Sequence, residues 1–369
     1  MNILIAAAYS PPQSGSFGAS VLEIGLYLKE KGDCLTVILP KNNNTVPEGS
    51  WANWIRGHGI TVYLYDREEN PDELAYLLNI ISEHKIDVLH LHFDMFLGTV
   101  IKHRKLLPKK VLLHDHMCFG KLEGNTLGMK LKHLAKSAYF RMLNLGVVSV
   151  GKEKDAVYAF AKHWYLPNGL TFRRNIAESQ SREQCRAALG IGPEEKTVLV
   201  LGWHCYYKGI DIAMKALDKL NREGHRILLC YVGIGNPPSQ SRVQFIRERA
   251  GVDPFADWIR YLPSTEDMYA YHRMTDVYLS SSRGEGFSFA ALEAISQGTS
   301  LVLSDIPGTR WAWDYSKAQV YPVESANACA DAVLKALQTE DKTHNGAELV
   351  EKYSIEDWCS GLYRIYKEC

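Results

Sequence analysis

The order of apolar and amphipathic segments constrains the fold of this chain more than any other feature. Short apolar runs alternate with stretches of helical period, and the whole pattern occurs twice. In the first half, the runs lie at 2–8, 34–40, 60–65, 86–92, 110–114 and 146–150, with helical patterns near 18–31, 72–84, 94–106, 127–144 and 152–161. In the second half, the runs lie at 197–203, 226–233, 257–262, 276–282, 300–304 and 319–323. This order predicts an α/β chain with open, mainly parallel, doubly wound sheets.

A break between two domains is expected near residue 168. The stretch Pro167-Asn168-Gly169 has the composition of a turn, and the polar run that follows it shows no strand pattern. A length of 369 residues also suits two domains better than one core. We expect domains at 1–168 and 169–354, and a final helix at 355–369 that packs back on the first domain. Because doubly wound sheets bind ligands beyond the carboxyl ends of their strands, the functional residues are sought in the strand-to-helix loops.

The composition disfavours several classes of protein. The formal net charge is zero, which argues against a general nucleic-acid binder. No run approaches the ~18–20 apolar residues of a membrane-spanning helix. The N-terminal stretch "MNILIAAAYSPP" has no basic leader, so we expect a first strand there and no signal peptide. The eight cysteines are scattered without a CxxC pair, which favours a reducing cytoplasm.

The segment 102–141 carries a local excess of positive charge. It holds ten Lys or Arg residues against two acidic ones, a difference of 10 − 2 = +8. Within it, Leu127, Leu131 and Leu134 share one helical stripe. Two interpretations stay open: a solvated face on a helix packed in the core, or a surface that docks on anionic lipid or an anionic acceptor. The second interpretation would use Lys130, Lys132 and Lys136.

Two loops of the first half bear polar groups suited to ligands. After the first strand, Gly15 and Ser16 would let backbone N–H groups approach a phosphate, although neither a GxGxxG nor a P-loop pattern is present and a turn without ligand remains open. Histidines follow the strands at 86–92 and 110–114, within "LHLHFD" and "LLHDHMCF". The histidines raise the alternative of a metal site, but no Cys or Glu stands at ligand spacing. We expect His114 to line the site as a hydrogen-bonding residue, and no metal.

The second half places two charged residues at strand-to-helix turns. Lys208 stands just before Gly209 and a new helix, where it is suited to meet a phosphate. In "RGEGFSFAALEAISQGT", we expect Ser288 to cap a helix that ends at Gly298. Glu285 would lie in the preceding loop, near the outward-pointing N–H groups of residues 287–289. Glu293 would lie among apolar residues, where its carboxylate is costly unless a ligand diol supplies hydrogen bonds.

These segments resemble one known family. The run from Glu285 to Glu293, followed by "GTSLVLSDIPG", is similar to the E-x7-E signature of retaining family 4 glycosyltransferases of the GT-B fold. Nearly the whole chain takes part, since "YSPPQSGS", "LHLHFD", "LLHDH", "LPNG", "KGIDIAMKAL" and "LLCYVGIG" stand in the family order. The resemblance implies two doubly wound Rossmann-like domains facing each other across a cleft. The first would bind the acceptor and the second the nucleotide-sugar donor.

The resemblance also implies roles for residues. Glu293 would bind the ribose hydroxyls, Glu285 would contact the donor sugar near its reacting centre, and Lys208 would hold the diphosphate. His114 would touch the sugar from the acceptor domain, which makes Glu285, His114 and Lys208 the catalytic set. The donor-binding set is Glu293, Lys208, Gly15, Ser16, Gly286, Phe287, Ser288, Phe289, Arg283 and Trp203. The implied reaction is retaining transfer that needs no metal and no cofactor, because the nucleotide sugar is itself a substrate.

One departure from the family pattern bears on catalysis. Trp203 stands where the family commonly has an arginine, and losing a guanidinium removes up to five hydrogen-bond donors. Either Arg283 or Lys208 alone supplies the charge, or catalysis is slower, or the donor is held differently. A catalytically degenerate donor-binding partner subunit and a sugar-nucleotide epimerase are therefore kept as alternatives.

The expected partners follow from the resemblance as well. We expect a UDP-sugar donor and a glycan or lipid-linked glycan acceptor in polysaccharide or glycoconjugate biosynthesis, and no nucleic acid. The basic segment favours a cytoplasmic protein that associates peripherally with the inner membrane face. No fingerprint of a dinucleotide-binding oxidoreductase is present.

Overall fold

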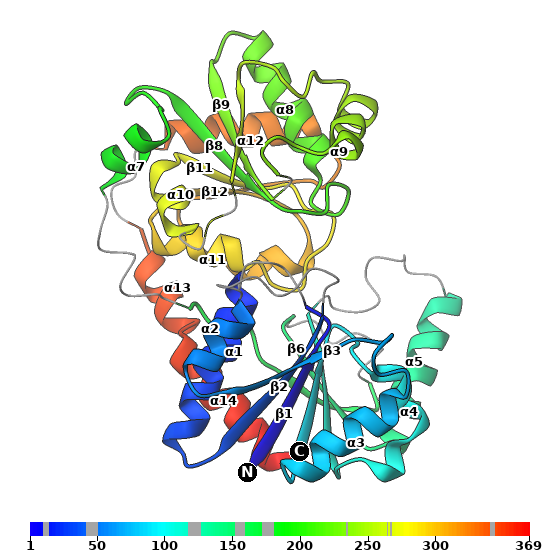
Figure 1. Ribbon diagram of the computed structural model, residues 1–369. Helices are drawn as coiled ribbons and strands as arrows, with labels where there is room; N and C mark the ends of the chain where they lie inside the picture. Colours follow the sequence, from blue (N-terminus) through cyan, green and yellow to red (C-terminus); the bar gives the residue numbers. More distant parts are fainter. Residues whose placement is uncertain are drawn as a thin grey trace. The chain divides into compact units, whose positions relative to one another are not determined.

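The chain divides into two compact units, shown in a computed structural model (Figure 1). The first unit is Met1–Thr171 together with Tyr353–Cys369, and the second is Phe172–Lys352. The structure describes residues 1–9, 15–41, 51–116, 127–151, 159–171, 181–233, 235–263, 265, 268–339 and 344–369. Each unit is described by itself below.

The first unit is built on a parallel seven-stranded sheet of order β3-β2-β1-β4-β5-β6-β7. The strands are β1 (Asn2–Ala7), β2 (Cys34–Pro40), β3 (Thr61–Tyr65), β4 (Val88–His92), β5 (Lys110–Asp115), β6 (Leu145–Ser149) and β7 (Lys162–Tyr165). Strand β7 was not expected, because its sequence KHWY is short, polar and only partly buried at the sheet edge. The strand order reverses between β1 and β4, which places a topological switch point there.

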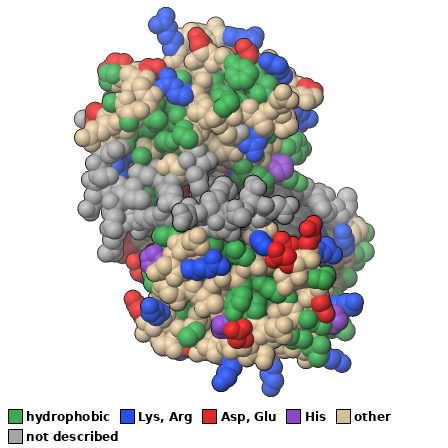
Figure 2. Space-filling view, in the orientation of Figure 1, with side chains coloured by type: hydrophobic (Ala, Val, Ile, Leu, Met, Phe, Trp, Pro, Cys, Tyr) green, Lys and Arg blue, Asp and Glu red, His purple; other side chains and the backbone are tan. Residues whose placement is uncertain are grey.

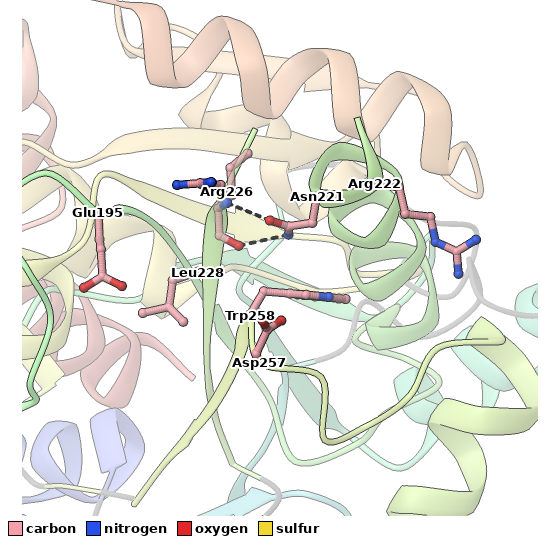
Figure 3. A pocket seen from close by; sticks show the side chains of 8 residues that line it. Glu195, Asn221, Arg222, Arg226, Leu228, Asp257 and Trp258 are labelled. Carbon is pink, nitrogen blue, oxygen red and sulfur yellow. Dashed lines mark hydrogen bonds between the residues drawn. The ribbon is translucent and has the colours of Figure 1, made fainter. Parts of the chain in front are cut away.

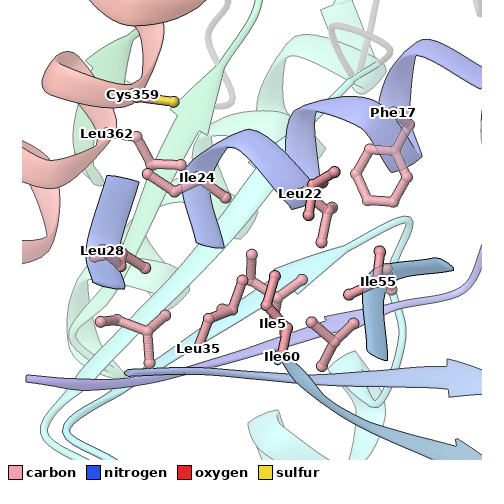
Figure 4. Packing of buried hydrophobic residues seen from close by; sticks show 14 of the residues in the cluster. Ile5, Phe17, Leu22, Ile24, Leu28, Leu35, Ile55, Ile60, Cys359 and Leu362 are labelled. Atoms are coloured by element: carbon pink, nitrogen blue, oxygen red, sulfur yellow. The ribbon is translucent and has the colours of Figure 1, made fainter. Parts of the chain in front are cut away.

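Helices cover both faces of this sheet (Figure 1). They are α1 (Gly15–Glu30), α2 (Trp51–Gly57), α3 (Glu73–Glu83), α4 (Leu97–Lys102), α5 (Leu127–Met142) and α14 (Ile355–Glu368), with a 3-10 turn at Arg104–Leu106. On one face, Ile24 and Leu28 of α1 pack with Leu362 of α14 above strand residues such as Ile5 (Figure 4). Alternate strand residues face the other layer, as expected for a sheet buried on both sides. Most of the helix expected at 152–161 lies outside the described residues.

The second unit repeats this architecture with a parallel six-stranded sheet of order β10-β9-β8-β11-β12-β13. Its strands are β8 (Lys196–Leu201), β9 (Ile227–Val232), β10 (Ile259–Leu262), β11 (Val277–Ser280), β12 (Ser300–Ser304) and β13 (Ala318–Tyr321). The order reverses between β8 and β11. The loops that follow these two strands therefore flank the position where doubly wound sheets bind ligands.

The helices of the second unit are α7 (Arg182–Ala188), α8 (Ile210–Arg222), α9 (Gln240–Phe245), α10 (Met268–Met274), α11 (Phe289–Ser296), α12 (Ala326–Gln338) and α13 (Gly346–Lys352), with a π-helical turn at Ile246–Ala250 and a 3-10 helix at Pro307–Ala312. Of these, α8 to α11 connect successive strands, α7 precedes β8, and α12 and α13 follow β13. The apolar faces of α8 and α12 pack in one core with residues of β8, β9 and β11. The doubly wound sheets expected from the sequence are thus confirmed in both units.

The surface carries both signs of charge. On the face drawn in Figure 2, basic and acidic side chains are interspersed with apolar ones over both units. Every helix of the described residues falls short of the length and apolarity required to cross a membrane.

Candidate functional site

Lys208 and Glu285 meet at the switch point of the second unit. Lys208 ends the loop after β8, and Glu285 lies in the loop after β11. The Lys208 ammonium donates a hydrogen bond of 2.5 Å to Glu285 Oε1, and the Ser282 hydroxyl donates to the same oxygen at 2.5 Å. The Glu285 side chain is 7% exposed and that of Lys208 is 32% exposed. The fold thus joins two residues that sequence reasoning had placed in separate loops.

The Glu285 carboxyl is held in its charged form. Burial alone would raise its pKa. The Lys208 ammonium and the hydroxyls of Ser282 and Ser288 oppose this effect and outweigh it, so the pKa of Glu285 lies below its ordinary value. At neutral pH this group is therefore an anion and not a proton donor.

The position of Lys208 is fixed by close packing between the two loops. The Ser281 hydroxyl donates to the Lys208 carbonyl at 2.8 Å. Gly209 has φ +60°, and a Cβ there would lie 1.8 Å from the Ser281 carbonyl oxygen. A Cβ on Gly202 would lie 2.4 Å from Lys208 Cγ. Only glycine fits at these two positions, so the backbone itself aims the lysine at Glu285.

Glu293 lies on α11, as the sequence predicted. Ser288 caps this helix by accepting a hydrogen bond of 3.3 Å from the Ala291 N–H, and Gly298 has φ +70° beyond its last turn. Glu293 is 8% exposed, and its Oε2 lies 3.6 Å from Nε2 of His272 on α10. His272 is fully buried, and within the described part of the chain neither ring nitrogen has a hydrogen-bond partner. Sequence reasoning missed His272, because nothing in the sequence links α10 to α11.

Arg283, which the sequence predicted to bind the donor, has its N–H donors bonded within the protein. All five of its N–H donors are used: Nη1 donates to Asp211 Oδ1 at 2.8 Å and to the Tyr206 carbonyl at 2.6 Å. Nη2 donates to Asp211 Oδ2 and to Glu324 Oε2, both at 2.9 Å, and Nε donates to Glu324 Oε1. The guanidinium also lies 4.3 Å from the centre of the Tyr206 ring. These donors hold the loop that carries Glu285, and donor binding by Arg283 stays a prediction.

A different guanidinium lies near the tryptophan that replaces the family arginine. The Trp203 side chain is 71% exposed, whereas its carbonyl accepts a hydrogen bond of 3.3 Å from Arg242 Nη2. Arg242 Nη1 donates to the Gly233 carbonyl at 3.0 Å. Arg242, from α9, thus spans the ends of β8 and β9. The sequence analysis missed Arg242. Its position in the first helix after β9, at the carboxyl end of a strand, is the feature that could have identified it.

The remaining residues of the 285–289 loop are arranged by packing. The Phe287 ring stacks on Trp311 at 4.4 Å between centroids. A Cβ on Gly308 would lie 2.1 Å from the Glu285 carbonyl oxygen, so the 3-10 helix after β12 packs closely against the loop. Gly286 and Ser288 are buried, and Phe289 opens α11.

Three expected site residues belong to the first unit. Gly15, with φ +48°, and Ser16 open α1, but residues 10–14 of the same loop lie outside the described residues. His114 is only 2% exposed and lies among other imidazoles, so the structure buries the ring that was expected to line a site. His116, two residues farther along, is the partly exposed histidine of "HDH".

Helix α5 presents apolar side chains to solvent. Leu127 is 75% exposed and Leu131 is 59% exposed, while Lys130 and Lys132 are exposed beside them. Lys136 differs, because it is half-buried with its ammonium 5.4 Å from the Phe140 ring centre. The interpretation of this leucine stripe as part of the core is therefore wrong for Leu127 and Leu131.

A hollow of 570 Å³ lies elsewhere in the second unit (Figure 3). It is lined by residues that include Asn221, Arg226 and Trp258. The Asn221 side chain bonds both backbone groups of Ile227 at 2.8 and 3.0 Å, at the start of β9. This hollow therefore faces the amino ends of the strands, away from Lys208 and Glu285.

Comparison with known proteins agrees with this geometry. Residues 181–352 match the family described as glycosyl transferases group 1. The second unit is a group 1 glycosyl transferase domain. This group 1 domain contains Lys208, Glu285 and Glu293, and its match begins and ends close to the bounds of the unit.

The similarity extends over the whole chain. Phosphatidyl-myo-inositol mannosyltransferase of Mycolicibacterium smegmatis is 28% identical over 396 residues, covering 100% of this chain and 94% of that protein. Among solved structures, Anabaena HepE in complex with UDP and glucose superposes with a TM-score of 0.79 at 13% identity, covering 100% of both chains. Sucrose-phosphate synthase of Thermosynechococcus elongatus superposes with a TM-score of 0.75 at 16% identity, covering 100% of this chain and 98% of that one. The two Rossmann-like units thus have the fold of GT-B glycosyltransferases.

Proposed function

We propose that this chain transfers a sugar, with retention, from a nucleoside diphosphate sugar to a hydroxyl group of a glycan or lipid-linked acceptor. The observation that carries the proposal is the Lys208–Glu285 pair at the switch point of the group 1 domain. The Lys208 ammonium suits the negatively charged diphosphate of the donor. The buried Glu285 carboxylate, 2.5 Å away, suits the anomeric carbon of the sugar. The assignment to family 4 rests on the Glu285-to-Glu293 spacing.

The diphosphate would be held by cations and helix N-termini. Lys208 has three N–H donors, so it can keep its bond to Glu285 and still donate to a phosphate oxygen. Arg242 supplies a guanidinium near Trp203 and replaces the charge that Trp203 lacks. The N-terminus of α8, directly after Lys208, adds further positive potential. Glu293 would accept hydrogen bonds from the ribose hydroxyls. A uracil base is favoured by the UDP complex of HepE.

The charge state of Glu285 limits the mechanism. Its lowered pKa makes it an anion, which suits stabilisation of positive charge at the anomeric carbon and not protonation of a leaving group. In the transfer, the acceptor oxygen forms a bond to the anomeric carbon as the bond to the diphosphate breaks on the same face. The departing phosphate takes the acceptor's proton. We expect no metal or cofactor in this step, since Lys208, Arg242 and helix N-termini offset the developing charge.

Donor binding is the first test of this proposal. We expect one nucleoside diphosphate among UDP, GDP, ADP and dTDP to raise the melting temperature, since ligand at ~100-fold over its Kd adds roughly 2.7 kcal/mol. NAD should have no effect. The shift should be lost in Glu293→Ala and kept in Glu351→Ala, a control at an exposed glutamate of α13. The readout is differential scanning fluorimetry over micromolar to millimolar ligand.

The outcomes separate the alternatives. Donor binding without product, even with crude membrane acceptors, would favour the degenerate partner subunit. Epimerised donor formed without acceptor would favour the epimerase. Product of inverted anomeric configuration, measured by proton NMR, would contradict retention.

The acceptor side of the proposal is a membrane-associated glycan. Leu127 and Leu131 stand exposed beside Lys130 and Lys132, the pattern of a helix that lies in a membrane interface. A relative named for phosphatidyl-myo-inositol, a membrane lipid, supports the same interpretation. We therefore propose peripheral binding to an anionic, cytoplasmic membrane face, and a role in polysaccharide or glycoconjugate synthesis.

Liposome binding tests the surface on α5. Wild-type protein should cosediment with vesicles containing anionic lipid, and Lys130→Glu/Lys132→Glu should lose most of this binding. Leu127→Ser/Leu131→Ser should lose it as well, with little change in stability, because both leucines are already exposed. Lys215→Glu/Lys335→Glu makes the same charge change at exposed sites of the second unit and should bind normally. If this control loses binding equally, the effect depends on net charge and not on α5. If wild-type protein does not bind anionic vesicles, the membrane proposal is wrong.

A further inference from the structure

Four histidines gather on one face of the first unit's sheet. His90 and His92 on β4, and His114 and His116 at the end of β5, each stand two residues apart, so all four point to the same side. The parallel register places His92 directly opposite His114. Their rings lie against one another, with centroids 4.2–5.2 Å apart for His90, His92 and His114. This side of the sheet is the one that α1 and α14 cover.

Two of these rings are oriented by partners outside the cluster's centre. Nδ1 of His90 is 2.9 Å from the hydroxyl of Tyr366 on α14, and Nδ1 of His92 is 2.8 Å from Nε2 of His116. Each ring therefore has one nitrogen fixed by a hydrogen bond. Nε2 of His90 faces Nδ1 of His114, and Nε2 of His92 has no hydrogen-bond partner within the described residues. A metal-bound histidine is typically oriented in this way, by a hydrogen bond at its second nitrogen.

The inner nitrogens are buried and short of partners. His90, His92 and His114 are 0–2% exposed. Nε2 of His92 and Nε2 of His114 have no hydrogen-bond partner within the described residues. A buried polar atom left without a partner costs about 1–3 kcal/mol, and an ion bound by Nε2 of His92 would remove that cost for one of these two atoms.

The spacing of the nitrogens suits one ion. One nitrogen from each of His90, His92 and His114 can be chosen so that all three lie within 4.8 Å of one another. Nδ1 of His114 is 3.3 Å from Nε2 of His90, which is long for a hydrogen bond. Two nitrogens on a tetrahedral ion at about 2.05 Å lie roughly 3.3 Å apart, so this pair already has the separation of two ligands.

The surroundings select the class of ion. Aromatic rings also border the cluster, since Phe17 lies 5.2 Å from the His92 ring and Phe93 stacks on His116 at 4.4 Å. An all-nitrogen set suits zinc, cobalt, nickel or copper, whereas magnesium and calcium require oxygen ligands.

We propose that His90, His92 and His114 bind one divalent transition-metal ion, of the zinc class, through one nitrogen each, with a fourth position left for water. The ion would tie β4 to β5 and, through Tyr366, to α14. It would be structural for the first unit. The charge stabilisation proposed for sugar transfer comes from Lys208, Glu285 and Arg242, which all belong to the second unit, and does not involve the ion.

The test begins with wild-type full-length chain freed of metal by a chelator. We expect it to retain one equivalent of zinc per chain after gel filtration, with a Kd in the micromolar range or tighter and a raised melting temperature. Cobalt should give visible absorption bands of tetrahedral intensity. X-ray absorption at the zinc edge should report three imidazole nitrogens at about 2.0–2.1 Å. A zinc content below one tenth of an equivalent, or an edge spectrum with fewer than two imidazoles, would overturn the proposal.

Variants locate the ion. His92→Asn and His114→Asn should each weaken zinc binding at least 100-fold, while His58→Asn, a control at an exposed histidine, should bind zinc as wild type does. Unchanged binding in His92→Asn and His114→Asn would place the ion elsewhere and refute the assignment. If a variant fails to fold, the zinc-edge spectrum of the wild-type chain still tests whether imidazole nitrogens bind the ion. Since the readout is metal content, it stands whether or not a nucleoside diphosphate binds the second unit.

Discussion

Replacing Lys208 by methionine is expected to slow sugar transfer by about 10²–10³-fold, the usual cost of removing one charge-stabilising donor from an active site. Lys208 is the cation closest to Glu285, at 2.5 Å, and the proposed mechanism uses it to stabilise the departing diphosphate. Methionine keeps the unbranched stem of the side chain, so the packing against Gly202 is preserved. Initial rates with saturating donor measure this effect. Lys215→Met, at an exposed lysine of α8, is the matched control and should leave the rate unchanged.

The same substitution should also destabilise the second unit. Without Lys208, the Glu285 carboxylate stays buried with only serine hydroxyls as partners. Breaking a fully buried ion pair costs about 3–5 kcal/mol, and we expect less here because the Lys208 side chain is 32% exposed. Adding Glu285→Gln should restore most of the free energy of unfolding, since the unpaired charge is then gone. It should not restore transfer. A double variant that regains activity would show that the pair is purely structural.

The sequence predicted the sheets well because their strands are buried on both faces. A strand such as β9, ILLCYV, appears as an unbroken apolar run, and that signal depends on burial alone. Elements at the margins were missed. Strand β7 is a polar edge strand of four residues, and α2 has only seven residues, too few to show a period. Helix α7 was missed although Ser181 and Gln184 form its capping box, because the polar run around it was interpreted as a linker.

The site could be predicted where local chemistry determines it. Ser288 as a cap, Glu293 on the helix behind it and Lys208 before Gly209 all follow from neighbours in sequence. What could not be predicted depends on contacts between distant segments. The His272 approach to Glu293 and the Arg242 contact with Trp203 both join elements that only the sheet order brings together. The hydrogen bond between His90 and Tyr366 likewise depends on α14, which comes last in the chain.

Replacing Arg283 by methionine is expected to lower the free energy of unfolding of the second unit by about 3–5 kcal/mol. Asp211 is 6% exposed, and Arg283 supplies two of its hydrogen bonds. Methionine would leave this carboxylate buried, with only the more distant Arg249, at 3.8 Å, as a countercharge. Glu324→Gln is the matched control, because Glu324 is 57% exposed and a pair of that kind is worth about 1 kcal/mol or less. Denaturant unfolding followed by circular dichroism compares the two variants.

Arg283→Lys separates a positioning role from direct donor binding. Lysine keeps the charge but has three N–H donors in place of five, so it cannot bond Asp211, Glu324 and the Tyr206 carbonyl in the same arrangement. If Arg283 positions the loop, Arg283→Lys should lose stability and lower kcat through a displaced Glu285, with KM for the donor little changed. A residue that binds the diphosphate directly would behave in the opposite way, with KM raised and the unfolding free energy unchanged. The second pattern would place Arg283 in the donor site and remove from Arg242 the role that we assign to it.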